Sequence, residues 1–442
     1  MRVVQVNYAF DPDLPSASAL LDRYTTLTGW ANALARAGTE VLTVQQFQTS
    51  SNVTRDRLPY TFGTFNEIAE AATGFRPDVV HVNGLEFARQ TWVLRRWCPR
   101  PIAIVVQDHA SQVGAGAMSR ALRPIRRRLM SVVDAFLFST PAQADPWRAA
   151  GLIGPRQGAY DVMEASTTLR ALERDEARSL SGVTGDPAAV WIGRLNANKD
   201  PLTVLDAFEH VAARRTGATL TMIFTDADLL DAVRARVVGS ATLRDRVRLA
   251  GDVAHDRIAA FLSAADIFVV GSHHEGSGYA LMEALACGAM PVVTDIPAFR
   301  ILTGVMTGVR HHRSSVSDTE RGSVRHPDPV SDTAGSGVRP SNQVSDRGSL
   351  RHPDLVSDTE RTGVRHHQDP VSDTERGTGG GGVGYLWTPG DPESCARAFE
   401  SAATQPNRQR VIDHFEKNLT WEAVGRRAVE IYRDVISNTA HG

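Results

Sequence analysis

Two glutamates in the second half of the chain stand in surroundings that call for a binding partner. Glu275 and Glu283 lie eight positions apart in the stretch EGSGYALMEALACGAMPVV, residues 275–293. Glu283 is surrounded by Ala, Leu and Met, where a carboxylate needs a partner or a ligand to offset its desolvation. Between the two, the turn 276–278 reads Gly-Ser-Gly. Such a turn can expose backbone N–H groups at the start of a helix, where the helix dipole favours an anion.

Two cations stand earlier in the chain in a similar setting. The strand-like run AAVWIGR ends on Arg194, and Lys199 follows five positions later in LNANKDP, near an expected helix start. Two fixed positive charges beside a helix N-terminus suit a diphosphate. Each residue also has an ordinary interpretation. Arg194 and Lys199 could be solvated loop charges, Glu283 could form a salt bridge on a helix face, and Glu275 could complement the helix dipole.

The spacing of the two glutamates suggests one extended ligand. Eight residues of helix rise about 12 Å, so Glu283 is expected up to two turns deeper than Glu275. A vicinal diol such as a ribose, which offers two donors to one carboxylate, would suit Glu283.

Strand and helix signals alternate along most of the chain and would position these residues. In the first half, Val3 to Val6 form a strand candidate, helical spacing runs from Leu20 to a stop at Gly38, and the apolar runs EVLTV, DVVHVNG, PIAIVVQD and AFLFST follow. A second series comprises AAVWIGR, TLTMIFTD, VRLAGDV, DIFVVGS and AMPVVTD. Short Val/Ile-rich strands between helices predict parallel sheets covered on both faces. We therefore expect an α/β protein of two doubly wound Rossmann-like domains facing across a cleft, with the loops at the carboxyl ends of the strands toward it.

Composition limits the class of protein. A chain of 442 residues with 42% hydrophobic and 22% charged residues predicts two soluble globular domains. The net charge of -2 and the pI near 6.7 argue against nucleic-acid binding. Cys98, Cys287 and Cys395 form no CxxC pair and predict reduced thiols in a cytoplasmic protein. We expect neither a signal peptide nor a membrane span.

One segment, 308–382, departs from this pattern. It repeats VSD five times and VSDTER three times, and it is nearly free of aromatic and large aliphatic residues. Such a composition cannot bury enough apolar surface to fold, so we expect a disordered, low-complexity insertion in a surface loop. Its paired histidines are a weak metal-binding signal, and its GGGGVG match to a dinucleotide motif follows no strand.

The resulting domain plan has five parts, with the insertion inside the second domain. The predicted boundaries are 1–165 for a first Rossmann-like domain, 166–187 for a linker, 188–307 and 383–412 for a second Rossmann-like domain, 308–382 for the insertion, and 413–442 for a C-terminal helix returning toward the first domain.

Several segments together resemble glycosyltransferase family 4. GRLNANKDP is similar to the family's Arg/Lys diphosphate segment, and EGSGYALMEALACGAMPVV to its E-x7-E signature with the trailing PVV strand. VRLAGDV, AADIFVVGS, TDIPAFR, GVGYLWTPGDPE and LTWEAVGRR fit in the same order. The resemblance is strong over most of the second half and rests mainly on architecture in the first. It implies a GT-B fold and a retaining enzyme that moves a sugar from a nucleotide-diphosphate sugar to an unidentified acceptor, a glycan, a lipid-linked molecule or a small molecule. In that fold the first domain would be the acceptor side and the second would bind the nucleotide sugar.

The resemblance also implies roles for individual residues. Arg194 and Lys199 would neutralise the donor diphosphate, Glu283 would bind the nucleotide ribose, and Glu275 would lie beside the transferred sugar. His109, in VVQDHAS, would lie beside the reaction centre, although it could instead be a structural histidine at a strand end. The donor would be a UDP-, GDP- or ADP-sugar, with no metal or other cofactor required. The remaining donor contacts would come from the backbone of Gly276, Ser277, Gly278, Tyr279 and Ala280.

The sequence departs from the family in two places. No Gly-Gly loop follows the first strand, where NYAFDPDLPSAS stands, and VMEAST replaces the usual Asn-Gly segment before the linker. A basic helical stretch could meet anionic lipid at the inner face of the membrane, or could simply be a solvated helix face. Its arginines are Arg120, Arg123, Arg126, Arg127 and Arg128.

Two further functions remain alternatives to an active transferase. The chain could be a catalytically impaired nucleotide-sugar-binding or scaffold protein of the same fold, with the repeat segment as an interaction tail. A nicotinamide dehydrogenase on the same architecture would need a phosphate-binding fingerprint after a first strand, and the sequence has none.

Overall fold

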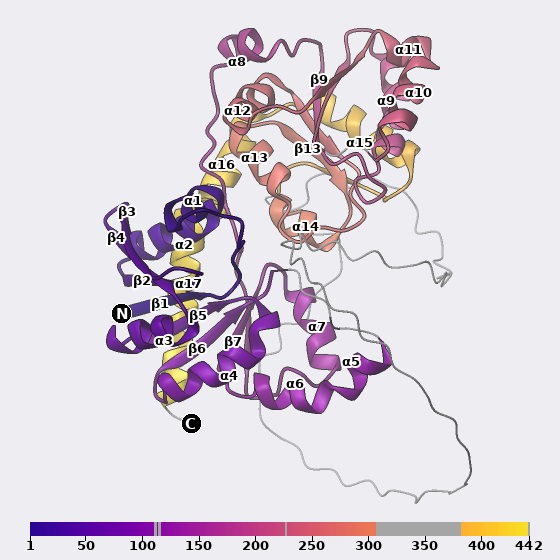
Figure 1. The fold of residues 1–442 in the computed structure, drawn as a ribbon. Coiled ribbons are helices and arrows are strands. Elements are labelled where there is room, and N and C mark those ends of the chain that lie inside the picture. Colours follow the sequence, from indigo (N-terminus) through magenta and orange to yellow (C-terminus); the bar gives the residue numbers. More distant parts are fainter. Residues whose placement is uncertain (110–112, 114–115, 226–227, 306–381, 441–442) are drawn as a thin grey trace, which may run out of the picture. The chain divides into compact units, whose positions relative to one another are not determined.

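The computed structural model describes residues 1–109, 113, 116–225, 228–305 and 382–440 (Figure 1). The predicted disordered insertion therefore lies outside the described residues, apart from Gly382. Within the described part of the chain, no helix is long and apolar enough to cross a membrane.

The first sheet contains eight strands in the order β3-β4-β2-β1-β5-β6-β7-β8. Every pairing is parallel except the antiparallel β3–β4 pair. The predicted strands of the first half are confirmed, whereas the β3–β4 hairpin was not predicted from the sequence. The strands are β1 (Arg2–Asn7), β2 (Glu40–Gln46), β3 (Ser51–Arg55), β4 (Leu58–Gly63), β5 (Val79–Asn83), β6 (Ala103–Gln107), β7 (Ala135–Phe138) and β8 (Gly158–Asp161).

The helices of the first half follow the predicted alternation with one difference. The helical spacing that begins at Leu20 is divided between two helices, because Tyr24 leaves helical geometry at φ -105° and ψ 70°. Gly38, with φ +85°, follows the end of the second helix as predicted. The helices are α1 (Ala17–Arg23), α2 (Thr25–Arg36), α3 (Phe65–Gly74), the 3₁₀ turn η1 (Leu85–Phe87), α4 (Ala88–Trp97), α5 (Ala117–Ala121), α6 (Arg123–Met130) and α7 (Pro141–Ala149).

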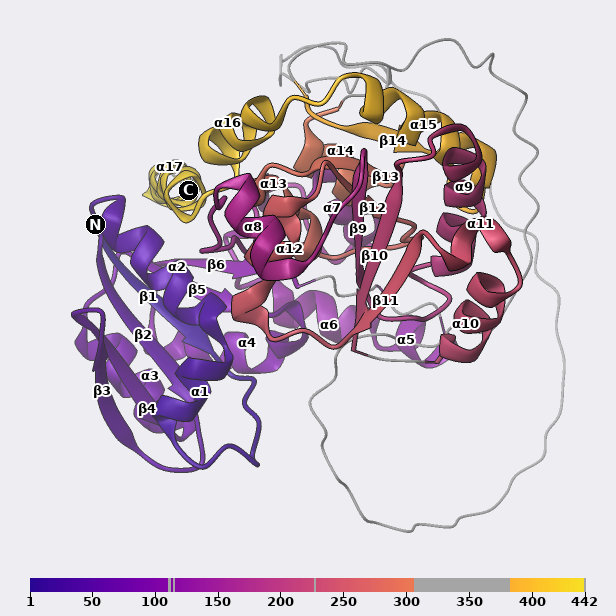
Figure 2. The ribbon, with the colours of Figure 1, turned by 90° about the horizontal axis from the view of Figure 1, so that it is seen from above.

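The second sheet contains six parallel strands in the order β11-β10-β9-β12-β13-β14. The order reverses between β9 and β12, and in open α/β sheets ligands bind outside the carboxyl ends of the strands at such a point. Figure 2 shows this sheet with helices on both sides. The strands are β9 (Ala188–Gly193), β10 (Thr219–Phe224), β11 (Val247–Gly251), β12 (Ile267–Val270), β13 (Met290–Thr294) and β14 (Tyr385–Trp387).

The helices of the second half cover this sheet around a core that includes the fully buried Trp191 and Phe268. One short helix, α8, lies inside the range predicted as a linker. The helices are α8 (Arg174–Ser181), α9 (Pro201–Arg214), α10 (Leu230–Val238), α11 (Ala241–Arg244), α12 (His255–Ala264), α13 (Tyr279–Cys287), α14 (Pro297–Thr303), α15 (Pro392–Thr404) and α16 (Arg408–Asn418).

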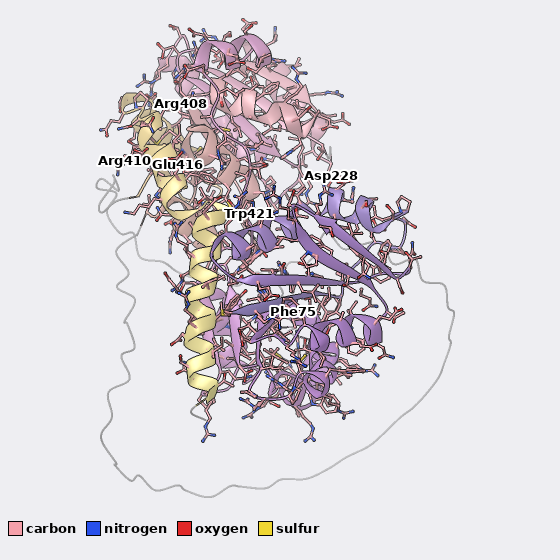
Figure 3. All side chains as sticks on the ribbon, turned by 90° about the vertical axis from the view of Figure 1, so that its left-hand side faces the viewer. Phe75, Asp228, Arg408, Arg410, Glu416 and Trp421 are labelled. Atoms are coloured by element: carbon pink, nitrogen blue, oxygen red, sulfur yellow. The ribbon has the colours of Figure 1, made fainter. Side chains whose placement is uncertain are left out.

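The last helix, α17 (Trp421–Ala440), packs against the first half of the chain. Trp421 and Tyr432 belong to the same apolar cluster as Trp30 of α2. A Cβ atom on Gly29 would lie 2.3 Å from the Trp421 ring, so the glycine leaves the space that this ring occupies. Figure 3 shows Trp421 at the beginning of α17, beside the helices and strands of residues 1–140.

Candidate functional site

Two loops meet at the point where the order of the second sheet reverses. The loop 194–200 leaves β9 and leads into α9, and the loop 271–278 leaves β12 and leads into α13. Asn198 joins them: its side-chain amide donates to the His274 carbonyl at 3.0 Å, and its side-chain oxygen accepts from the His274 backbone N–H at 3.1 Å. The His273 N–H donates to the Asn198 carbonyl at 2.8 Å. Asn198 was not among the predicted site residues, although an Asn in a strand-to-helix loop is a recognisable signal for such bonding.

The structure brings the predicted residues Lys199 and Glu275 into contact. The Lys199 ammonium donates to Glu275 Oε1, and the Ser272 hydroxyl donates to the same oxygen at 2.7 Å. The side chains of Lys199 and Glu275 are 17% and 14% exposed, so the pair is largely shielded from water. Arg194 is half-buried at the beginning of the same loop as Lys199. The two loops therefore place an ion pair and a second cation at the expected ligand-binding edge of the sheet.

The Gly-Ser-Gly turn begins α13 as the sequence predicts. Gly278 is the residue before the first helical turn and has φ +64°, which favours glycine. A Cβ atom there would also lie 2.6 Å from Leu302 of α14, so a larger residue would displace the turn. Ser277 directs its hydroxyl to Glu164, a residue of the segment that follows β8.

The two glutamates lie closer along the helix than the sequence suggested, because 275–278 form a loop and the helix begins only at Tyr279. Glu283 therefore lies one turn into α13, with Oε1 2.7 Å from His255 Nε2 of α12. Burial raises the pKa of the Glu283 carboxyl, and His255 partly offsets this.

Glu283 faces a different pocket from Glu275. It lines a pocket of about 930 Å³ together with Tyr279, His255 and residues of α2, whereas Glu275 lines a pocket of about 400 Å³. The structure thus does not bring the two carboxylates into one pocket.

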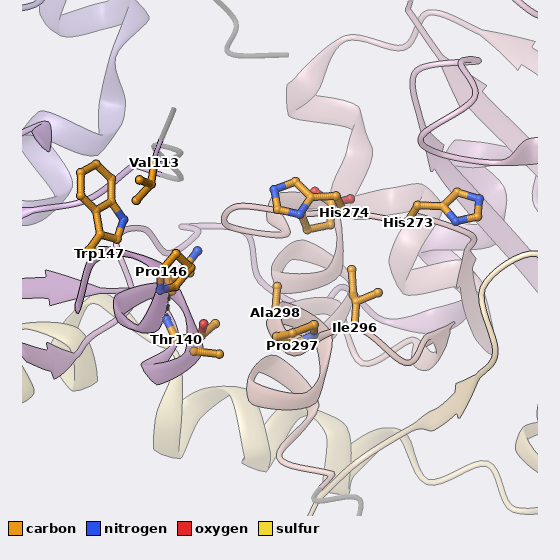
Figure 4. A pocket seen from close by; sticks show the side chains of 12 residues that line it. Val113, Thr140, Pro146, Trp147, His273, His274, Ile296, Pro297 and Ala298 are labelled. Atoms are coloured by element: carbon orange, nitrogen blue, oxygen red, sulfur yellow. Dashed lines mark hydrogen bonds between the residues drawn. The ribbon is translucent and has the colours of Figure 1, made fainter. Parts of the chain in front are cut away.

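The pocket beside Glu275 is lined from two sides (Figure 4). One side comes from α7 and the residue before it, including Thr140, Pro146 and Trp147. The other comes from the loop after β12 and from the beginning of α14. The residues of this second side are His273, His274, Glu275, Ile296, Pro297 and Ala298.

His109 lies two positions after β6 and contacts a carboxylate. Its Nδ1 is 2.5 Å from Oε2 of Glu164, whose side chain is 6% exposed. Burial lowers the pKa of His109, but the hydrogen bond and the charge of Glu164 outweigh it, with further contributions from Glu86 and Asp108, so the net shift is upward. Glu164 was not predicted as a site residue. Its one sequence signal is a carboxylate in VMEAST, the segment that departs from the family pattern.

The basic stretch divides into exposed and covered arginines. Arg120, Arg127 and Arg128 are exposed on α5 and α6, whereas Arg126 lies over the ring of Trp147 with its guanidinium carbon 4.6 Å from the ring centre. Three apolar side chains on or between these helices are also exposed: Met118 (73%), Leu122 (48%) and Ile125 (58%).

The fold and the comparison with solved structures define the class of protein. The two doubly wound sheets form a GT-B fold of the kind found in glycosyltransferases. A crystal structure of a glycosyltransferase from Rickettsia africae superposes with a TM-score of 0.61 over 99% of both chains, at 10% identity.

Within this class, part of the second half of the chain matches one particular family. Residues 186–316 match the model of the family described as glycosyl transferases group 1. The GDP-mannose:cellobiosyl-diphosphopolyprenol alpha-mannosyltransferase of Xanthomonas campestris is 29% identical over 128 residues, which are 29% of this chain and 34% of that protein. The glycogen synthase of Mycobacterium tuberculosis is 28% identical over 234 residues, which are 50% of this chain and 52% of that protein. The chain thus spans between a third and about half of the length of these two relatives.

Proposed function

We propose that the protein is a retaining glycosyltransferase that moves a sugar from a nucleotide-diphosphate sugar to an acceptor hydroxyl. The observation that carries this proposal is the contact between Lys199 and Glu275 at the carboxyl ends of β9 and β12. The group 1 match over 186–316 includes both loops. Lys199 and Arg194 would hold the diphosphate, Glu275 the sugar, and the turn 276–280 would supply backbone N–H groups.

The proposed transfer breaks the bond between the anomeric carbon and the donor diphosphate and forms one to the acceptor oxygen on the same face of the sugar. The departing diphosphate accepts the acceptor's hydroxyl proton. Lys199 and Arg194 stabilise the negative charge that develops on the diphosphate, which is the electrostatic contribution these residues can make without a metal. Glu283, with Tyr279 and His255, lines a separate pocket and is proposed to bind the ribose of the donor.

A donor screen followed by a variant tests this function. UDP-, GDP- and ADP-sugars are added to the full chain, and the donor that stabilises the folded state is identified by its thermal shift. The Glu275→Ala variant removes a contact to the sugar but also frees Lys199 from its carboxylate partner for the diphosphate, so we expect donor binding to be retained. Turnover should fall by about 10²–10³, the usual effect of removing one preorganised electrostatic group. The exposed Glu393→Ala serves as the matched control.

Three outcomes separate the alternatives. Donor binding with no transfer or donor hydrolysis by the unmutated protein, with each candidate acceptor class supplied, would favour the impaired binding protein. Product with inverted anomeric configuration, measured by NMR, would contradict retention. Full turnover in Glu275→Ala would remove this residue from the site.

Helices α5 and α6 carry exposed apolar and basic side chains, a combination that favours contact with a membrane surface. Met118 of α5, Leu122 between the two helices and Ile125 of α6 are all exposed. The exposed Arg120, Arg127 and Arg128 on the same two helices would attract anionic lipid. We propose that the protein acts at the inner face of the cytoplasmic membrane.

Vesicle sedimentation tests the membrane contact. The full chain should co-sediment with phosphatidylcholine vesicles that contain phosphatidylglycerol. Replacing Met118, Leu122 and Ile125 together by Ser should release it. Replacing the equally exposed Leu180 and Val238 by Ser should not. Equal binding of both variants would contradict this surface.

A further inference from the structure

Glu164 joins loops of the two sheets through its carboxylate. It lies three positions after β8 and is 4% exposed. Its Oε2 is 2.5 Å from Nδ1 of His109, which follows β6 of the first sheet. Its Oε1 accepts a hydrogen bond from the Ser277 hydroxyl in the Gly-Ser-Gly turn of the second sheet. Each carboxylate oxygen therefore has one partner, and the partners come from opposite halves of the chain.

The backbone of Glu164 is fixed as well as its side chain. The indole N–H of Trp30 in α2 donates to the Glu164 carbonyl at 2.6 Å. Trp30 is itself fully packed, with its ring 5.0 Å from that of His81 in an edge-to-face contact. A side chain held at both ends in this way has few rotamers available, so it can impose its geometry on its partners.

A carboxylate is the group that these contacts require. A buried carboxylate without partners would be strongly unfavourable, whereas bonds from a hydroxyl and an imidazolium offset its desolvation. Because the Nδ1 proton is committed to Glu164, the orientation of the His109 ring is set.

We propose that Glu164 is a positioning residue that sets the orientation of His109 and of Ser277 at the same time, and so aligns the acceptor side of the site with the turn that holds the donor sugar. This inference rests on the proposed function. Glu164 itself is not proposed to touch the substrate. Its effect is exerted through the two side chains that it holds.

The charges around His109 determine what a variant should do. Glu164 has the largest favourable effect on the protonated form, and Glu86 and Asp108 add to it. Burial opposes it. The charge on His109 in turn lowers the pKa of the neighbouring His81. Arg126 is close enough to Asp108 and Glu86 to be affected by them. Replacing Glu164 by Gln keeps the size of the side chain and removes its charge, so the pKa of His109 should fall.

An NMR titration of the full chain tests the contact without any substrate. The imidazole signals are recorded with ¹³C-labelled histidine, and the His109 signal is identified by its loss in His109→Gln. The pKa of His109 should fall by about one to two units in Glu164→Gln. Glu86→Gln should produce a smaller decrease. An unchanged pKa in Glu164→Gln would overturn the proposal whether or not transferase activity is found.

Kinetic measurements separate the positioning effect of Glu164 from the effect of its charge. Glu164→Asp keeps the negative charge but shortens the side chain by one methylene, so it cannot reach both partners. We expect the pKa of His109 to stay above its ordinary value in this variant while kcat falls at least tenfold and the donor KM changes less than threefold. A kcat equal to that of the unmutated protein would overturn the positioning role. If Glu164→Gln fails to fold, Glu164→Asp and Ser277→Ala provide the same comparison of kcat and KM.

Discussion

Lys199 and Glu275 form an ion pair with each other. A diphosphate that binds Lys199 must therefore either displace the Glu275 carboxylate from the ammonium group or bind the ammonium group together with it. Both residues can be predicted from the sequence because each follows a buried strand, and carboxyl ends of parallel strands lie at one edge of a sheet. No sequence pattern indicates that the two side chains touch. Whether two loop side chains meet depends on the backbone bonds between their loops, here those of Asn198 with His273 and His274.

The proposed phosphate role of Lys199 can be tested by comparing two ligands. Lys199→Ala should weaken binding of the nucleoside diphosphate by about 10- to 100-fold, since a hydrogen bond to a charged group contributes about 1.5–3 kcal/mol. Binding of the nucleoside alone should change less than threefold. Isothermal titration calorimetry measures both, with Arg397→Ala as a control at an exposed site. Equal losses for the two ligands would contradict the phosphate role.

His81 should make stability depend on pH. This histidine is fully buried in β5, with Nδ1 2.5 Å from the Tyr432 hydroxyl of α17. Burial and the charge on His109 lower the pKa of His81 to about 3. Because the unfolded chain takes up this proton first, at its ordinary pKa near 6.5, stability is lost as pH falls from about 6.5 toward 3. His109, with its raised pKa, acts in the opposite direction.

Urea unfolding measures the His81 contribution by difference. Between pH 7 and pH 5, the unmutated protein should lose about 2 kcal/mol more than His81→Gln. The exposed His210→Gln should lose as much as the unmutated protein. If His81→Gln shows the same pH dependence as the unmutated protein, His81 is not the group responsible.

At the scale of elements, periodicity predicted most strands and helices and missed those whose formation depends on distant partners. The runs DVVHVNG and DIFVVGS are continuous and apolar, and both became buried parallel strands, β5 and β12. Strand β3 alternates half-buried and exposed residues at the edge of the first sheet, and its signal is correspondingly weak. The division between α1 and α2 depends on the backbone of Tyr24, which no spacing rule indicates.

The close packing of α2 against α17 offers a test at this scale. A Cβ atom on Gly425 of α17 would lie 2.3 Å from the Ala33 carbonyl oxygen of α2, so the helices would have to move apart. Gly425→Ala should therefore lower the free energy of unfolding by about 1–3 kcal/mol. Gly74→Ala, in α3, is the matched control, because a Cβ atom there meets nothing within 4 Å. Urea unfolding should show Gly74→Ala unchanged or slightly stabilised. Equal stability of Gly425→Ala and the unmutated protein would contradict the close approach of the two helices.

At the scale of the whole molecule, the two residues on either side of the undescribed segment 306–381 lie next to each other. Val305 ends the segment after α14, and Gly382 begins the segment before β14. A Cβ atom on Gly382 would lie 2.7 Å from the Val305 nitrogen. Helix α16 holds both sides: Arg410 donates to the Gly382 carbonyl at 2.7 Å, and His414 Nε2 lies 2.8 Å from the Leu302 carbonyl oxygen.

This arrangement predicts that residues 308–379 can be removed. The four residues 306, 307, 380 and 381 would then join two chain ends that already lie side by side, so the parallel pairing of β13 with β14 need not change. We expect the shortened protein to be expressed in soluble form, to unfold within about 2 °C of the full chain, and to bind the donor with a Kd within twofold, since a ΔΔG below about 0.4 kcal/mol corresponds to that change. Thermal unfolding and calorimetry provide the measurements. Loss of soluble protein would mean that 308–379 contributes to the fold, and loss of donor binding alone would place part of this segment at the site.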